Sequence, residues 1–396
     1  MQKKYQRYKQ KIKRKYLILS KRVLRLFSKK SKPKISHRNK VSLIPSGSLA
    51  FEALKDLIKE SKKYIELEYY IIKDDDFGRE LSDILIKKAD ENVEIKIIYD
   101  DIGSWGSKPL FNKLNMHPNI EVIPFNPIKF FSNPFRWDVR DHRKLAIFDG
   151  KKAIVSGWNI GEEYFDDSKD YMRDAGILIS GPAVSILRKS FYEIYEKSGG
   201  KNYRFKEIKV EPTGNDNVWI IESGLHKKFK AIYNAYCLAM MASKKTIWIE
   251  NAYFVPPKKI RKILSNAVSR GVDVKIILPD KIDVPIVKYA SHKYFESLLK
   301  IGVKIFERKN LILHSKIALI DNIWVTIGST NLHKRSLEKN YELNIVVTSE
   351  DFGNEIKKFM EEDIRDSITI DYNNWKRRPI INKIKENIAG IFAYFL

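Results

Sequence analysis

The chain has 396 residues, of which 74 are Lys or Arg and 49 are Asp or Glu, so its formal net charge is +25. A hydrophobic fraction of 43%, with 12% aromatic residues, is sufficient for a large buried core and excludes a globally disordered protein. The length corresponds to two or three domain-sized units. The single cysteine, Cys237, excludes a disulfide within the chain and any multi-cysteine zinc site, and we interpret it as a small buried apolar residue.

The positive charge is concentrated at the amino terminus. Residues 1–40 contain 17 Lys and Arg and no acid, which leaves a net charge of +8 for the remainder. We expect this basic arm to bind phosphate groups, either on an anionic membrane or on a nucleic acid. Apolar residues at helical spacing favour an amphipathic helix on a membrane surface, and a solvated or nucleic-acid-binding helix is the alternative. These apolar residues are Ile12, Tyr16, Leu19, Val23, Leu26 and Phe27. The arm contains no apolar run approaching the ~18–20 residues of a membrane span.

An internal repeat organises the rest of the chain. The alternating apolar segment 65–72 is repeated at 247–255, and each copy is followed by a helical stretch and a second apolar run, at 93–100 and 272–279. Strands that alternate with helices predict βαβ units and an α/β fold in two repeated halves. The predicted boundaries are a basic amphipathic arm at 1–40, a first half at 41–195, a linker at 196–216, a second half at 217–350 and a helical tail at 351–396.

Two further segments are rich in apolar residues. The loop 125–137 contains several phenylalanines, which predict either a buried hydrophobic cluster or a surface for acyl chains and membrane. The tail has apolar residues at helical spacing. The sequence is compatible with docking of this helix either on the domain or on lipid. The apolar residues of the tail are Ile381, Ile384, Ile388, Phe392 and Phe395.

A second, tighter repeat carries the candidate chemistry. Each half contains a His, followed two residues later by Lys, seven residues later by Asp and 17 residues later by Asn. All four positions recur after 172 residues, and such a double match among seven histidines is not plausibly accidental. The residues are His142, Lys144, Asp149 and Asn159 in the first half, and His314, Lys316, Asp321 and Asn331 in the second.

The spacing of this repeat indicates strands. Alternate residues of a strand share a face, so His314 and Lys316 project together, and the apolar run 317–320 fits a buried strand that ends in a turn. If the halves pack about a pseudo-twofold axis, the two His–Lys pairs meet in one pocket suited to a phosphodiester. Lysines hold phosphoryl oxygens, asparagine amides donate hydrogen bonds, one imidazole attacks phosphorus, and the other donates a proton to the leaving oxygen. No carboxylate cluster suited to a metal is evident, so we predict covalent catalysis without metal or cofactor.

Carboxylates that orient the two imidazoles are also expected. Glu342 is the candidate in the second half, and Asp174 is its counterpart in the first half, where Asp170 and Glu163 compete with it. The two motif aspartates lie five residues beyond the lysines. At that distance along a strand we expect them to be structural supports rather than direct acids.

The duplicated motif resembles the signature of the phospholipase D superfamily, and the surrounding residues resemble bacterial cardiolipin synthases. The likeness extends from near residue 45 to the end of the chain. The resemblance implies two phospholipase D-like α/β/α halves related by pseudo-twofold symmetry, each a mainly mixed sheet flanked by helices, with the active site between them. The segments that carry it are 68–71, 142–151, 159–164, 181–184, 253–256 and 375–379.

The resemblance also implies a reaction. One phosphatidylglycerol donates its phosphatidyl group to a second through a phosphohistidine, which gives cardiolipin and glycerol. By the family's usual assignment His142 is the nucleophile and His314 the general acid, and the sequence alone does not separate these roles. Many relatives start with two membrane spans where this chain has its basic arm. We therefore expect an anionic phospholipid membrane as partner and peripheral attachment at the cytoplasmic face of a bacterial cell membrane.

The sequence departs from the family pattern in the second half. His333 follows Leu332 where the family usually has an acid, which leaves the acceptor alcohol open. The alternative function is a phospholipase D-type phosphodiesterase that hydrolyses phospholipid or nucleic acid. A nucleic acid is disfavoured by the apolar stripe of the arm, the aromatic loop and the amphipathic tail. The oligomeric state is left open.

Overall fold

The computed structural model describes residues 33–127, 138–166, 172–201, 205–224 and 230–392. Most of the basic arm, most of the loop 125–137, Asp170 and Phe395 lie outside these residues. Within the described ranges, no helix has both the length and the apolar character needed to cross a bilayer.

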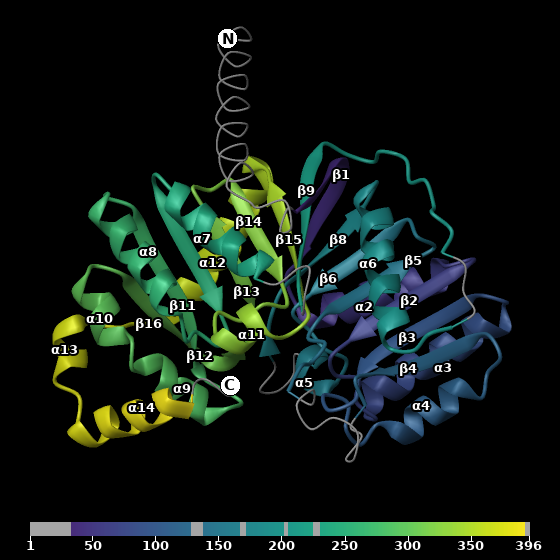
Figure 1. The fold of residues 1–396 in the computed structure, drawn as a ribbon, viewed down its shortest axis with the longest axis horizontal. Helices are drawn as coiled ribbons and strands as arrows, with labels where there is room; N and C mark the ends of the chain where they lie inside the picture. The colour runs from purple at the N-terminus through teal and green to yellow at the C-terminus, as the bar shows by residue number, and fades with distance from the viewer. Residues whose placement is uncertain (1–32, 128–137, 167–171, 202–204, 225–229, 393–396) are drawn as a thin grey trace, which may run out of the picture.

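The first half of the chain forms a sheet flanked by helices (Figure 1). Its central strand β5 is buried at all five positions, as expected for a strand covered on both faces. Its elements are β1 (Lys34–Ile44), α2 (Gly47–Glu60), β2 (Tyr64–Tyr69), α3 (Asp76–Asp90), β3 (Glu94–Asp100), α4 (Lys108–Asn115), β4 (Ile120–Phe125), β5 (Lys144–Phe148), β6 (Lys152–Ser156), α5 (Glu162–Phe165), β7 (Met172–Arg173), β8 (Gly176–Ser180) and α6 (Ala183–Lys197).

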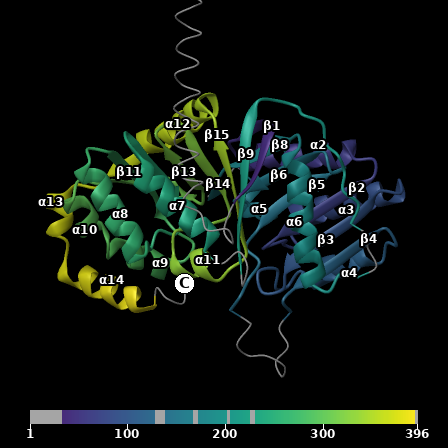
Figure 2. The same ribbon diagram turned by 45° about the horizontal axis from the view of Figure 1, so that its top comes forward.

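The second half repeats this arrangement beside the first (Figures 1 and 2). Its elements are β9 (Asp216–Ser223), α7 (Ala231–Ala242), β10 (Thr246–Asn251), α8 (Lys258–Ser269), β11 (Asp273–Lys281), α9 (Pro285–His292), α10 (Phe295–Lys300), β12 (Lys304–Leu313), β13 (Lys316–Ile320), β14 (Trp324–Gly328), α11 (Lys334–Glu338), β15 (Glu342–Thr348), α12 (Glu350–Arg365), β16 (Ser367–Thr369), α13 (Tyr372–Lys376) and α14 (Ile380–Phe392).

Strand order confirms the duplication. The first half runs β8-β6-β5-β2-β3-β4, and the second runs β15-β14-β13-β10-β11-β12 in the same relative order. In both halves the last three strands of the path are parallel and the others antiparallel. The predicted α/β fold, with two mixed sheets related by internal repetition, is therefore confirmed. Strands β1 and β9 pair with each other and join the two sheets at the centre.

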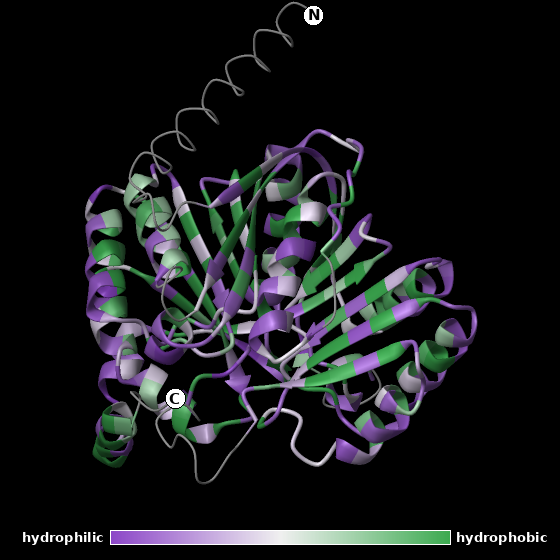
Figure 3. Ribbon diagram, turned by 45° about the vertical axis from the view of Figure 1, so that its right-hand side comes forward, coloured by the Kyte–Doolittle hydropathy of each residue, from purple (hydrophilic) through white to green (hydrophobic). Residues whose placement is uncertain are grey.

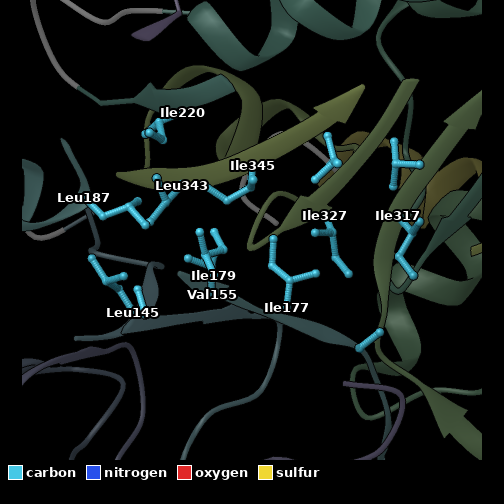
Figure 4. Packing of buried hydrophobic residues seen from close by; sticks show 14 of the residues in the cluster. Leu145, Val155, Ile177, Ile179, Leu187, Ile220, Ile317, Ile327, Leu343 and Ile345 are labelled. Atoms are coloured by element: carbon cyan, nitrogen blue, oxygen red, sulfur yellow. The ribbon is translucent and has the colours of Figure 1, made fainter. Parts of the chain in front are cut away.

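An apolar core joins the two halves. Strand residues of the first half, including Val155 and Ile177, face strand residues of the second, including Ile327 and Ile345 (Figure 4). Hydrophobic residues are concentrated along these strands (Figure 3). All of these side chains are almost fully buried and belong to one continuous cluster. Because the cluster draws on both sheets, the halves are held in one fixed relation that positions the site between them.

Two predicted boundaries differ from the structure. Strand β1 begins at Lys34, inside the predicted basic arm, because its pairing with β8 and β9 satisfies both edges of its backbone in the centre of the molecule. Helix α12, assigned by sequence to the tail, packs into the core through Phe352, Ile356 and Phe359, and β16 extends the sheet beside β12. The second half therefore continues to Thr369. The described residues between α6 and β9 contain no helix or strand.

Candidate active site

The two His–Lys pairs occupy equivalent positions. Lys144 is the first residue of β5 and Lys316 the first residue of β13, and each histidine lies two residues earlier. Lys144 Nζ donates to the His142 carbonyl oxygen at 2.7 Å, and Lys316 Nζ donates to the carbonyl oxygen of His314. Both lysines are almost completely buried. Each ammonium group is therefore held against its own histidine.

Each imidazole is paired with a carboxylate from the other half of the chain. His142 Nδ1 lies 3.2 Å from Glu342 Oε2, and His314 Nδ1 lies 2.7 Å from Asp174 Oδ2. The backbone makes the same exchange: the N–H of His142 donates to the Tyr341 carbonyl, and that of His314 to the Arg173 carbonyl. A single site is formed because each half supplies the acid that orients the other half's histidine.

Burial gives Glu342 an unusual protonation behaviour. Its carboxylate is fully buried, and it accepts hydrogen bonds from the hydroxyls of Ser329 and Ser336. Burial raises its pKa to about 8, and the serine hydroxyls together with Lys144 and Lys316 oppose that rise.

The buried surroundings of the His–Lys pairs disfavour positive charge. Burial lowers the pKa of Lys144 to about 7, and burial also lowers the pKa of Lys316. The pKa of His142 is held well below its usual range by burial and by both lysines. Burial and Lys316 lower the pKa of His314 as well, but the adjacent Asp174 acts in the opposite direction. An anionic phosphodiester bound among these groups would offset their mutual repulsion.

The two asparagines lie in buried surroundings at equivalent places. Asn159 Oδ1 accepts from the backbone N–H of Ile71 at 3.1 Å, and its Nδ2 donates to the Tyr164 hydroxyl at 2.7 Å, which uses one of its two amide hydrogens. The backbone N–H of Asn331 donates to Ser336 Oγ. Among the described residues, Asn331 Oδ1 is buried without a hydrogen-bond partner.

The two motif aspartates lie at the far end of the strands from the histidines. Asp149 accepts hydrogen bonds from the backbone N–H groups of Lys62, Lys63 and Tyr64, and Asp321 accepts from those of Lys244, Lys245 and Thr246. Five residues of strand separate each aspartate from its lysine by about 16 Å. These contacts place both aspartates in turns rather than beside the imidazoles.

One of the competing acids is engaged elsewhere. Glu163 forms an ion pair with Lys73 at 2.6 Å, whereas Asp174 is the acid that contacts an imidazole. In the part of the chain that the structure describes, no group of three or more His, Cys, Asp or Glu side chains could hold a metal ion.

Aromatic side chains and a third histidine, which the motif spacing did not identify, surround the pairs. The Tyr70 ring lies 5.0 Å from that of His142, and the rings of Tyr164 and Tyr253 lie 5.6 Å and 6.5 Å from that of His314. His333 caps α11, with its ring 6.2 Å from that of Tyr253, and it contributes to the low pKa of His142. Tyr70 and Tyr253 belong to the repeated apolar segments, and all three tyrosines lie in segments that carry the family resemblance.

The fold and the duplicated His–Lys site define a phospholipase D-type enzyme. The family model described as the phospholipase D-like domain of cardiolipin synthase matches residues 54–195 and 236–364. The chain therefore belongs to the cardiolipin synthase family of the phospholipase D superfamily, which confirms the resemblance seen in its sequence.

Individual relatives agree with this assignment. A cardiolipin synthase of Geobacillus thermodenitrificans is 32% identical over 370 residues, which cover 91% of this chain and 73% of that protein. Cardiolipin synthase 2 of Bacillus anthracis is 32% identical over 369 residues, which cover 91% of this chain and 72% of that protein. The crystal structure of a phosphatidylserine synthase from Haemophilus influenzae superimposes with a TM-score of 0.70 at 13% identity, covering 92% of this chain and 97% of that one, which supports the fold.

Proposed function

We propose that this enzyme transfers a phosphatidyl group from one phosphatidylglycerol to a second, forming cardiolipin and releasing glycerol. The observation that carries the proposal is the exchange of acids between halves, with His142 bound to Glu342 and His314 to Asp174. This exchange brings two imidazoles and two ammonium groups to one site, as a double displacement at phosphorus needs. The names of the relatives favour cardiolipin as the product.

In the first step, His142 is the nucleophile. Because Nδ1 of His142 is held by Glu342, its Nε2 is the nitrogen left to attack phosphorus, and its low pKa keeps it unprotonated. A P–N bond forms while the bond from phosphorus to the glycerol headgroup breaks. His314 donates its proton to the departing glycerol oxygen, and Asp174 favours this proton on His314.

In the second step, the headgroup hydroxyl of another phosphatidylglycerol attacks the phosphorus. Now neutral, His314 takes the hydroxyl proton, the new P–O bond forms, and the P–N bond to His142 breaks. Lys144 and Lys316 hold the phosphoryl oxygens through both steps, and Asn159 and Asn331 add hydrogen-bond donors. The enzyme returns to its starting protonation state, ready for another donor.

We also place the enzyme at an anionic phospholipid membrane, as a peripheral protein of the cytoplasmic face. The formal net charge of +25 supports this location, since a cationic protein is attracted to anionic headgroups.

Incubation with phosphatidylglycerol vesicles tests the proposal. Lipid mass spectrometry is expected to show one cardiolipin formed for each glycerol released, and neither product with His142→Ala. Phosphatidic acid and glycerol without cardiolipin would mean that water is the acceptor, so the transferase proposal would be wrong. Activity close to wild type in His142→Ala would contradict the assigned nucleophile.

A further inference from the structure

Helix α14 exposes its apolar residues. Six large apolar side chains along it are between 49% and 77% exposed, which is unusual for a contiguous helix face in water. We call this set the isoleucine face. It consists of Ile380, Ile381, Ile384, Ile388, Ile391 and Phe392.

The opposite face of α14 buries a charge. Glu386 is only 3% exposed, and the Arg378 guanidinium donates hydrogen bonds of 2.8 Å and 2.7 Å to its two carboxylate oxygens. The same guanidinium also donates to Glu296 in the first turn of α10 at 2.8 Å. A helix on the surface of a water-soluble protein normally shows the reverse pattern, with charged residues outward and apolar residues inward. The Arg378 bonds fix the rotation of α14, so the isoleucine face is held outward by specific contacts.

The inner face of α14 fits closely onto the second half. Ala389 packs with Val255 and Val287, and the partly buried Tyr253 packs against this small cluster. Gly390 lies close to Lys293, since a Cβ atom at Gly390 would be 2.5 Å from the side chain of Lys293. Helix α14 lies along α9 at the rim of the second half (Figures 1 and 2). Since the Tyr253 ring faces His314, one layer of side chains separates α14 from the active site.

The charges around the isoleucine face are mainly positive. Lys376, Arg377 and Lys385 are exposed, and Lys383 is half-buried. Apolar side chains bordered by cations are typical of helices that lie in the interface of an anionic bilayer. A helix of this length spans about 20 Å, less than the roughly 30 Å of a hydrocarbon core, so it suits an orientation along the surface.

We propose that the isoleucine face docks in the surface of an anionic phospholipid bilayer and thereby holds the active-site rim against the lipid. This inference rests on the proposed function for its lipid substrate, but the contact with the bilayer is testable separately. Charge complementarity favours lipid over other occupants. A second copy of the chain would bring a face with the same positive charges, and the basic arm would bring its 17 Lys and Arg residues. Both would be repelled by the cations around the isoleucine face.

Site-specific labelling tests the contact directly in the full chain. The single native thiol, Cys237, is buried at 1% exposure, so Ile388→Cys can be labelled selectively with an environment-sensitive dye. Ile368→Cys is the matched control, because Ile368 is exposed on β16, outside the isoleucine face. With phosphatidylglycerol vesicles, the Ile388 dye is expected to shift to the blue and brighten about twofold or more, and nitroxide-labelled lipid should quench it. The Ile368 dye should not respond.

Two results would overturn the proposal. One is an Ile388 dye that does not respond to the vesicles. The other is an Ile388 dye whose emission is already shifted to the blue without lipid. A shift that grows with protein concentration would identify a second copy of the chain as the occupant of the isoleucine face. A shift that is independent of concentration would identify another segment of the same chain.

Removing the apolar side chains provides a second test. The variant Ile384→Ser/Ile388→Ser/Ile391→Ser should bind phosphatidylglycerol vesicles about tenfold more weakly in sedimentation at high salt, where attraction between the basic arm and lipid is screened. Its unfolding midpoint should match wild type, since these side chains are exposed, and Ile368→Ser should bind as wild type does. Unchanged binding by the triple variant would contradict the proposal. Failure of the proposed function would appear differently, as vesicle binding without cardiolipin.

Discussion

The two motif histidines differ in the acid that each one contacts. His314 contacts Asp174 at 2.7 Å, and this acid acts to raise the pKa of the imidazole. His142 contacts Glu342 at 3.2 Å, and burial together with both lysines holds the pKa of this imidazole well below its usual range. The asymmetry favours His314 as the group that carries the proton and His142 as the neutral nucleophile.

Asp174→Asn tests this asymmetry. Removing the charge lowers the pKa of His314, so the alkaline limb of the pH profile of kcat/KM should move to lower pH. The maximal rate should fall about ten- to a hundredfold, as for other partners that orient a catalytic imidazole. The matched control is Glu163→Gln, since Glu163 pairs with Lys73, and its profile should keep the wild-type limb. An unshifted alkaline limb in Asp174→Asn would show that Asp174 does not support the proton on His314.

The sequence predicts the types of the site residues better than their partners. Spacing identified the His–Lys pairs, whereas Glu342 and Asp174 were candidate acids, the latter chosen beside competitors in the same half. It could not show that each acid crosses to the other half, because that exchange depends on how two sheets pack. The sequence also did not place Tyr164 and His333 beside the His–Lys pairs, because each approaches the site through tertiary contacts rather than through the repeat.

At the scale of single elements, the motif aspartates explain how the central strands end. Asp149 and Asp321 adopt left-handed backbone conformations with φ of 50° and 52°, which aspartate tolerates better than most residues. Each carboxylate accepts three backbone N–H groups from the start of the neighbouring strand. These bonds set the register between β5 and β2 and between β13 and β10, and so fix where the lysine at the other end is placed.

Asp321→Ala is therefore expected to destabilise the fold. Loss of three charge-assisted hydrogen bonds should lower the free energy of unfolding by about 2 kcal/mol, measured by denaturant titration. Asp321→Asn, which keeps an acceptor oxygen, should lose less. Well below the melting temperature, kcat of the folded enzyme should stay near wild type. A hundredfold loss of kcat with unchanged stability would instead assign Asp321 to the chemistry.

On the scale of the whole molecule, each half of the duplicated fold supplies the acid that contacts the histidine of the other half. The sequence repeat correctly predicted two α/β halves, and the equal strand orders confirm it. It did not predict that β1 starts at Lys34, because the basic composition of this segment resembles that of the arm before it. It also did not predict that α12 packs into the core, because an amphipathic pattern does not show which surface the apolar face of a helix contacts. The orientation of α14 was unpredictable for the same reason.

Covalent labelling during turnover tests most directly whether both halves act as a single site. Enzyme mixed with phosphatidylglycerol is quenched in alkali, digested and mapped by mass spectrometry for phosphatidyl-histidine. We predict at most one phosphatidyl group per chain, carried by the His142 peptide and absent from the His314 peptide. Independent modification of both peptides, with up to two groups per chain, would show two separate half-sites and contradict the account.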